Sequence, residues 1–173
     1  MRDLKRPNAA LPAYRLFREK QVEVFTPMKC CLRNVGGKMI REQAPFIPDL
    51  LFVCGTREEI DAIVDKNRTI QYRYLKGGYK IPMMVPGVEM DRFIRAVGEA
   101  ESPRYYLPQE VTPDMLRRKV RIVGSPLDGY EGHLLSVRGS KKKYLLVELP
   151  GFFFVAAEVC PDYIELLPPV AGR

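Results

Sequence analysis

Residues 118–132 read RKVRIVGSPLDGYEG, and this stretch decides the fold of the second half of the chain. Val120 and Ile122 alternate with charged residues, which predicts a strand with one face in a core. Gly124-Ser125-Pro126 predicts a turn, and the glycines that follow supply the backbone freedom that a tight corner needs. We therefore expect a strand, a tight turn and a returning strand.

The rest of the second half repeats this pattern of short extended runs between turn residues. With the opening strand there are five, each rich in β-branched and aromatic residues. Several short strands at close spacing are typical of a small barrel, which we place at 115–168. The predicted strands are Lys119–Val123, His133–Val137, Tyr144–Leu149, Phe152–Ala157 and Ile164–Leu166.

The first half mixes helical and extended patterns, which predicts an α/β sandwich with an antiparallel sheet over 1–99 and an α+β protein as a whole. Gly36-Gly37 predicts a hairpin turn. Thr56 followed three residues later by Glu59 has the capping-box form that opens a helix. Helices are expected at 7–20, 57–66 and 88–97, and strands at 22–25, 28–35, 38–44, 48–54, 70–75 and 79–85.

Between the two halves the pattern stops. Pro103, Pro108 and Pro113 fall in a stretch without periodicity, which predicts a linker over 100–114. The expected order is an α/β domain, a linker and a small β-barrel.

The net charge of +7 is uneven. Residues 1–100 hold 18 Lys and Arg against 12 Asp and Glu, whereas residues 101–173 hold 10 against 9. The excess in the first part is suited to a polyanionic partner. General solubility explains an excess of this size equally well, and the charge leaves both readings open.

No enzyme class gains support from the residues. His133 is the single histidine, and no nucleophile-and-base motif surrounds it. The cysteines Cys30, Cys31, Cys54 and Cys160 lack the spacing of a zinc site, so free buried cysteines in a reducing compartment are expected. We expect no metal and no cofactor. Without a long apolar run or a secretory signal, the expected location is the cytoplasm.

Two stretches carry a resemblance to a known family. Residues 118–132 resemble the KOW motif, and Gly151-Phe152 and Val155–Val159 fit the rest of a KOW barrel. Val24-Phe25-Thr26-Pro27 and residues 45–53, PFIPDLLFV, resemble the N-terminal domain of NusG proteins. Together they cover nearly the whole chain in the order of NusG-type transcription elongation and antitermination factors. The detail is most similar to the UpxY group of specialised NusG paralogues from Bacteroides.

The chain departs from that family in two places. The family's first strand begins with a tryptophan before the region that matches residues 1–4, and this chain has none, so we expect it to start inside that strand. The tyrosine of the family's later strand is Leu50 here, which removes a hydroxyl from the expected contact surface.

The resemblance implies binding to RNA polymerase, at the clamp helices of its largest subunit, and suppression of pausing or termination, here at polysaccharide biosynthesis operons. The motif positions imply an apolar patch, with further contacts to the opposite side of the cleft through Thr56 and Arg57. A core role for part of the patch stays open, because alternate strand residues face opposite ways. The patch comprises Phe25, Pro27, Ile47, Pro48, Leu50 and Phe52.

Contact with the non-template DNA strand or the upstream duplex is the second implied interaction. Basic residues interleaved with tyrosines suit single-stranded nucleic acid. A solvated hairpin whose tyrosines pack on the helices is an equal alternative. The basic residues are Arg68, Arg73, Lys76 and Lys80, between and around Tyr72, Tyr74 and Tyr79.

The KOW barrel in this family recruits a ribosomal protein or the termination factor Rho, which makes both possible partners. A ribosome-associated, RNA-binding KOW protein is the alternative function. That alternative predicts a basic barrel, and the nearly neutral second part of the chain favours the elongation factor instead.

Overall fold

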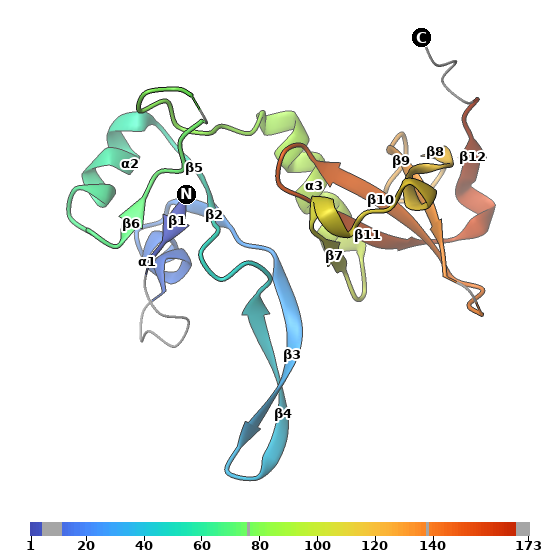
Figure 1. Cartoon of the computed structure of the whole chain (residues 1–173), viewed down its shortest axis with the longest axis horizontal. Coiled ribbons are helices and arrows are strands. Elements are labelled where there is room, and N and C mark those ends of the chain that lie inside the picture. The colour runs from blue at the N-terminus through green and yellow to red at the C-terminus, as the bar shows by residue number, and fades with distance from the viewer. Residues whose placement is uncertain (5–11, 76, 138, 169–173) are drawn as a thin grey trace. The chain divides into compact units, whose positions relative to one another are not determined.

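The computed structural model describes residues 1–4, 12–75, 77–137 and 139–168. Over these residues the chain is a mixed α/β protein with three α-helices and several antiparallel sheets, one of them six-stranded (Figure 1). It divides into two compact units, Met1–Met84 and Val85–Arg173, called unit 1 and unit 2 below. In the described ranges no helix combines the length and apolar character needed to cross a membrane.

Unit 1 packs two helices against short antiparallel strands. β2 (Glu23–Phe25) pairs with β5 (Phe52–Cys54), and β1 (Arg2–Asp3) pairs with β6 (Ile70–Gln71). An antiparallel bridge between Arg2 and Leu50 connects the two pairs. The helices α1 (Ala13–Glu19) and α2 (Arg57–Val64) contribute to the core, whose buried members are Ala13, Phe17, Leu51, Ile63 and Ile70.

The start of α1 is held by a carboxylate from β1. Asp3 is buried, and its Oδ2 accepts a hydrogen bond of 2.6 Å from the backbone N–H of Ala13. A carboxylate satisfies a backbone donor that the first turn of a helix leaves unpaired. The part of the expected 7–20 helix before Pro12 lies outside the described residues.

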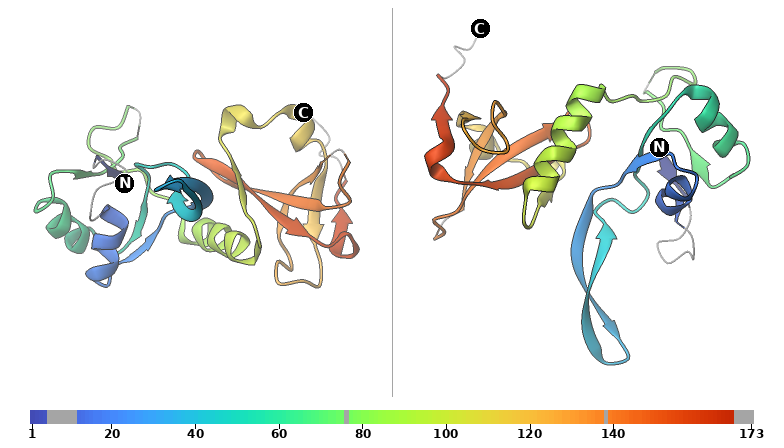
Figure 2. Two further views of the ribbon diagram at one scale, coloured as in Figure 1. Left: turned by 90° about the horizontal axis from the view of Figure 1, so that it is seen from below. Right: turned by 180° about the vertical axis from the view of Figure 1, so that it is seen from behind.

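The predicted hairpin is confirmed. β3 (Met28–Val35) pairs residue for residue with β4 (Lys38–Pro45). Gly36 and Gly37 have φ of 58° and 83°, and the Gly37 N–H donates to Asn34 Oδ1, so the turn uses the conformation that glycine adopts without strain. The hairpin extends away from the other elements of unit 1 (Figure 2).

Unit 2 is built on the six-stranded antiparallel sheet, whose strand order is β12-β8-β9-β10-β11-β7. Its outermost strands are β7 (Arg104–Tyr106) and β12 (Ile164–Leu166). The five predicted strands all lie in it, with ends shifted by up to two residues. The remaining four strands are β8 (Lys119–Ile122), β9 (Glu131–Ser136), β10 (Lys143–Leu149) and β11 (Phe153–Val159).

The structure differs from the predicted division of the chain at 100–114. α3 (Gly87–Glu99) packs on β10 and β11 of unit 2, with Phe93 edge-on to Phe153 at 5.2 Å between ring centroids. Residues 104–106 form β7 on β11, and the short helices η1 (Pro108–Glu110) and η2 (Pro113–Leu116) follow. Pro103, Pro108 and Pro113 predicted a linker because they interrupt any periodicity. Prolines are equally compatible with 3-10 turns and with a three-residue edge strand.

Candidate functional site

The paired strands β2 and β5 create an aromatic pair on one face of unit 1. Phe25 lies directly opposite Phe52 in the register, with ring centroids 6.3 Å apart and an interplanar angle of 37°. The adjacent pair, Val24 and Val53, packs against the core with Leu51. Because side chains alternate along a strand, Phe25, Leu50 and Phe52 belong to the face opposite that core.

The other predicted patch residues differ in exposure. Ile47, like Phe25 and Phe52, is partly exposed, and Pro48 is exposed. Leu50, at 3% exposed, and Pro27 are buried, so neither side chain is available on the surface of the structure. We call Phe25, Ile47, Pro48 and Phe52 the aromatic face below.

Thr56 has a structural role at the start of α2. Its backbone N–H donates to Glu59 Oε2 at 2.9 Å, and the Glu59 N–H donates to Thr56 Oγ1 at 3.3 Å. These are the reciprocal bonds of the predicted capping box. The bonds from the Thr56 backbone and hydroxyl lower the pKa of Glu59.

Arg57 is likewise engaged within unit 1. Its Nε donates to both carboxylate oxygens of Asp61, at 2.9 and 2.8 Å, and its guanidinium lies 4.7 Å from the ring centroid of Tyr72. The Tyr72 hydroxyl donates to Asp61 Oδ1 at 2.7 Å. Hydrogen bonds from Tyr72 first and Arg57 second lower the pKa of Asp61, and burial with the Asp61 bond raises the pKa of Tyr72. The cluster holds a surface cation in a defined orientation.

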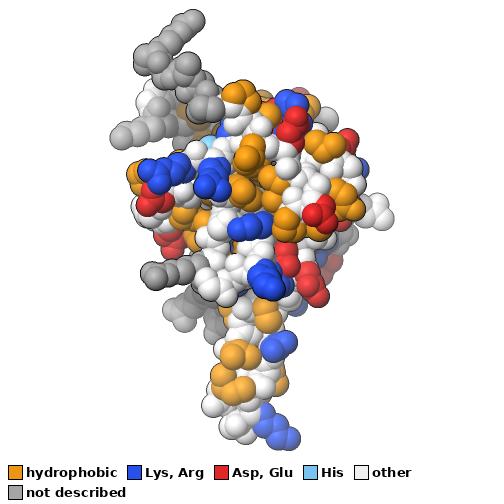
Figure 3. Space-filling model, turned by 90° about the vertical axis from the view of Figure 1, so that its right-hand side faces the viewer, with side chains coloured by type: hydrophobic (Ala, Val, Ile, Leu, Met, Phe, Trp, Pro, Cys, Tyr) orange, Lys and Arg blue, Asp and Glu red, His pale blue; other side chains and the backbone are white. Residues whose placement is uncertain are grey.

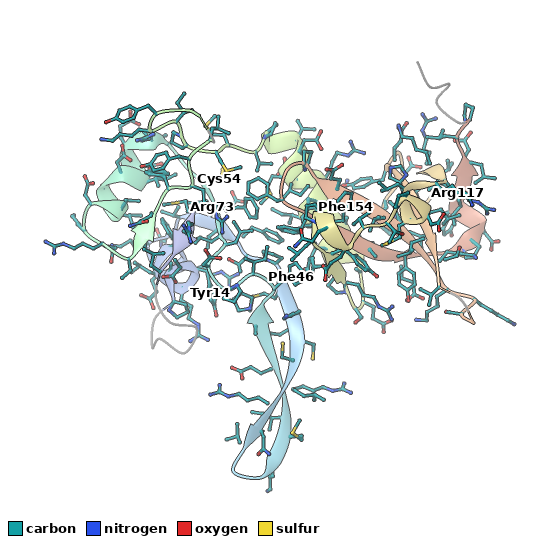
Figure 4. All side chains as sticks on the ribbon, in the orientation of Figure 1. Tyr14, Phe46, Cys54, Arg73, Arg117 and Phe154 are labelled. Atoms are coloured by element: carbon teal, nitrogen blue, oxygen red, sulfur yellow. The ribbon has the colours of Figure 1, made fainter. Side chains whose placement is uncertain are left out.

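The predicted nucleic-acid residues differ in exposure and in pairing. Arg68 and Lys80 are exposed. Arg73, labelled in Figure 4, is partly buried and its Nη2 donates to Asp49 Oδ2 at 3.2 Å, a carboxylate oxygen that also accepts from Arg2. Lys76 lies outside the described residues. Arg73 is therefore already paired, and Lys80 and Arg68 remain as exposed cations.

Around Lys80 the chain forms a short exposed loop with an aromatic tip. The Leu75 N–H donates to the Ile81 carbonyl, and Tyr74 and Pro82 form an isolated antiparallel β-bridge. These contacts bring the two sides of the loop together as in a hairpin, but the two strands expected at 70–75 and 79–85 are not formed over their length. Tyr79 is 86% exposed, and the Lys80 amine lies 5.4 Å from its ring centroid. An open tyrosine beside a cation is a chemically suitable platform for an unpaired base.

The β3–β4 hairpin carries exposed basic side chains that the sequence interpretation did not single out (Figure 3). Lys29, Arg33, Lys38 and Arg41 are all exposed on it, against the one acidic residue Glu42. A signal was available, because four basic residues fall within a predicted two-stranded ribbon whose faces are too polar for a core.

The described residues contain no candidate metal site, and their cysteines are unpaired. They contain no group of three or more His, Cys, Asp or Glu that would hold a metal ion. The four cysteines are free, as expected, but the expectation that they are buried is wrong. Cys30, Cys54 and Cys160 are exposed and Cys31 is partly exposed, because Cys30 and Cys31 lie on the hairpin and Cys54 and Cys160 at strand ends.

Unit 1 has a groove between the end of α1 and α2. Its lining includes the cations Lys20 and Lys66 and the anions Glu23 and Glu59. Opposite charges in near balance favour neither an anionic nor a cationic ligand. Comparison with known proteins adds no assignment: no family model matches the chain, and no curated protein matches it.

Proposed function

We propose that the chain is a transcription elongation or antitermination factor of the NusG type, with a NusG-like first unit and a KOW barrel in the second. Unit 1 binds the clamp helices of the largest RNA polymerase subunit through the aromatic face. A partner that binds the active polymerase better than its paused state shifts the population toward the active one. The protein then acts in the cytoplasm, without catalysis of its own.

One observation carries the proposal. The two stretches that resemble the NusG N-terminal domain, 24–27 and 45–53, are far apart in sequence, yet Phe25 and Phe52 are direct cross-strand partners. Their face lies opposite the core of unit 1. Aromatic and aliphatic anchors of this kind suit packing against helices.

Unit 2 supports the second half of the proposal. The strand-turn-strand of residues 118–132 is present as β8 and the start of β9, and β8 lies between β9 and β12. The last strand therefore lies beside the first predicted barrel strand, in a sheet whose edge strands are β12 and β7. In this proposal unit 2 recruits a ribosomal protein or Rho, and polysaccharide operons are the targets.

The test is binding of purified core RNA polymerase to the full chain and to Phe25→Ser plus Phe52→Ser. Leu50 is avoided because it is buried. The matched control, Tyr14→Ser plus Tyr79→Ser, removes two aromatic side chains of the same unit outside the aromatic face. Circular dichroism establishes that all three proteins fold.

We expect the wild type and the control to bind, and the aromatic-face variant to bind at least about tenfold more weakly, as loss of interface anchors does. A wild type that ignores polymerase and binds ribosomes would favour the ribosome-associated KOW protein. Equal binding by a folded aromatic-face variant would refute the clamp-helix contact.

A further inference from the structure

The segment that carries Ile47 and Pro48 of the aromatic face is a tight turn. The Leu50 N–H donates to the Ile47 carbonyl at 3.1 Å, which is the hydrogen bond of a β-turn with Pro48 and Asp49 at its centre. Proline suits the first central position, because its fixed φ matches the turn. The Asp49 carbonyl accepts from the Asp3 N–H at 2.9 Å, which ties the end of the turn to β1. An exposed turn closed by one hydrogen bond is ordinarily among the less stable parts of a domain.

Two arginines hold the side chain of Asp49. Arg2 Nε donates to Asp49 Oδ2 at 3.1 Å, and Arg73 Nη2 donates to the same oxygen at 3.2 Å. We call Arg2, Asp49 and Arg73 the Asp49 clamp below. The three side chains are between 32% and 48% exposed, so each ion pair adds little to the stability of the whole unit. The effect of the clamp is therefore expected at the turn itself.

Both arginines come from backbone that is held in place elsewhere in unit 1. Arg2 belongs to β1 and lies opposite Gln71 of β6. The Arg73 carbonyl accepts from the Met83 N–H at 2.7 Å, so Arg73 lies at the base of the loop around Tyr79. Charged side chains on a fixed backbone are a defined support for a carboxylate on a turn. The clamp thus connects the turn to two segments that are distant in sequence.

We propose that Arg73 is a positioning residue for the aromatic face. With Arg2 it holds Asp49, and Asp49 fixes the turn that presents Ile47 and Pro48. The guanidinium of Arg73 touches neither polymerase nor nucleic acid in this inference and acts only through Asp49. Its place among basic residues and tyrosines in the sequence predicted contact with nucleic acid, and the ion pair with Asp49 gives it a different role.

A positioning role has a consequence for affinity. Ordering a segment during binding costs free energy, and a turn that is ordered beforehand avoids part of that cost. The Asp49 clamp should therefore strengthen binding without any contact to the partner. This consequence rests on the proposed function, because it needs a partner on the aromatic face. The order of the turn is measured without a partner.

The experiment compares the full chain with Asp49→Asn, Arg73→Gln and the two changes combined. Asp49→Asn is the decisive variant, because it frees the Arg73 guanidinium and keeps its charge. The matched control is Asp65→Asn, which removes a carboxylate from an exposed position of the same unit at the end of α2. Binding to purified core RNA polymerase and hydrogen exchange of the Leu50 N–H are measured. Thermal unfolding followed by circular dichroism checks that every variant folds.

We expect Asp49→Asn and Arg73→Gln each to weaken polymerase binding by about threefold, the size that exposed charge pairs reach. Both should speed the exchange of the Leu50 N–H, because the turn opens more often. The combined variant should bind like Asp49→Asn alone, since Arg73 acts only through the carboxylate that Asp49→Asn removes. Asp65→Asn should match the wild type, and the unfolding temperatures should stay close to that of the wild type.

The inference is overturned if Asp49→Asn binds polymerase as tightly as the wild type or more tightly, which is the result expected of an Arg73 that contacts the partner directly. Losses that add up in the combined variant, an equal loss in Asp65→Asn, or an unchanged exchange rate of the Leu50 N–H overturn it as well. If the wild type does not bind polymerase, the proposed function fails, and the exchange rate alone decides whether the Asp49 clamp fixes the turn.

Discussion

Gly132 in β9 lies against the backbone of Leu146 in β10 so closely that a Cβ on the glycine would be 2.5 Å from the Leu146 carbonyl oxygen. The same Cβ would be 3.0 Å from Cδ1 of Leu145. No side chain fits between two backbones at this distance, so glycine at 132 is required by packing and not by an unusual φ angle. The glycine that closes the 118–132 stretch is thus what lets β9 approach β10 this closely.

Replacing Gly132 by Ala should lower the free energy of unfolding of unit 2 by about 1–3 kcal/mol, since the added carbon overpacks the sheet. Gly98→Ala is the control, because Gly98 lies in α3 and a Cβ added there would meet open space. This replacement should raise the free energy of unfolding by up to about 1 kcal/mol. Urea unfolding followed by circular dichroism measures both. A Gly132→Ala protein as stable as the wild type would show that β9 and β10 are not this close.

Thr56→Ala should destabilise unit 1 by about 1 kcal/mol, because it removes the hydroxyl that accepts from the Glu59 N–H at the start of α2. Thr56→Ser keeps this hydroxyl and should remain near the wild type. Hydrogen exchange of the first turn of α2 is the direct measurement. Equal hydrogen exchange in the two variants would show that the Thr56 hydroxyl does not stabilise the start of α2.

The Tyr72–Asp61 bond predicts a pH dependence. Asp61 has a pKa below its ordinary 3.8 in the folded chain, so its contribution to stability is present above that value and is lost as pH falls through the folded-state pKa. Tyr72→Phe removes the largest cause of the shift. We expect the pKa of Asp61 to rise toward 3.8, and the stability gap between variant and wild type to narrow below that pH.

Carboxyl NMR titration of Asp61 measures this shift directly. Tyr74→Phe is the control, since in the described structure the hydroxyl of this neighbouring ring makes no hydrogen bond to Asp61. An unchanged Asp61 titration in Tyr72→Phe would mean that Arg57 alone sets it.

The packing of α3 on unit 2 predicts where the chain can be divided. A fragment of residues 85–168 should unfold cooperatively, whereas 115–168 lacks α3 and β7 and should be less stable. Phe93→Ala, which removes a fully buried ring from Phe153, should cost about 3–5 kcal/mol within 85–168. Calorimetry measures the stability of both fragments. Equal stability of 85–168 and 115–168 would show that residues 100–114 act as a linker and do not stabilise the sheet.

Local patterns were sufficient for most elements. The Gly36-Gly37 turn predicted β3 and β4 to within a residue, and Thr56 with Glu59 predicted the start of α2. Each of these depends on hydrogen bonds between residues close in sequence. The candidate site was harder, because the strand alternation that separates Leu51 from Phe52 says which residues share a face but not which face meets the core.

The sequence by itself determined the mixed α/β class, the five strands between Lys119 and Leu166, the β3–β4 hairpin and the cap of α2. Only the tertiary structure decided that α3 belongs with β10 and β11, that Leu50 is buried, and that Arg73 is already paired with Asp49. The physical reason is that periodicity records which side of an element is apolar or charged. The surface or side chain it meets comes from residues far away in the sequence, and their positions exist only once the chain has folded.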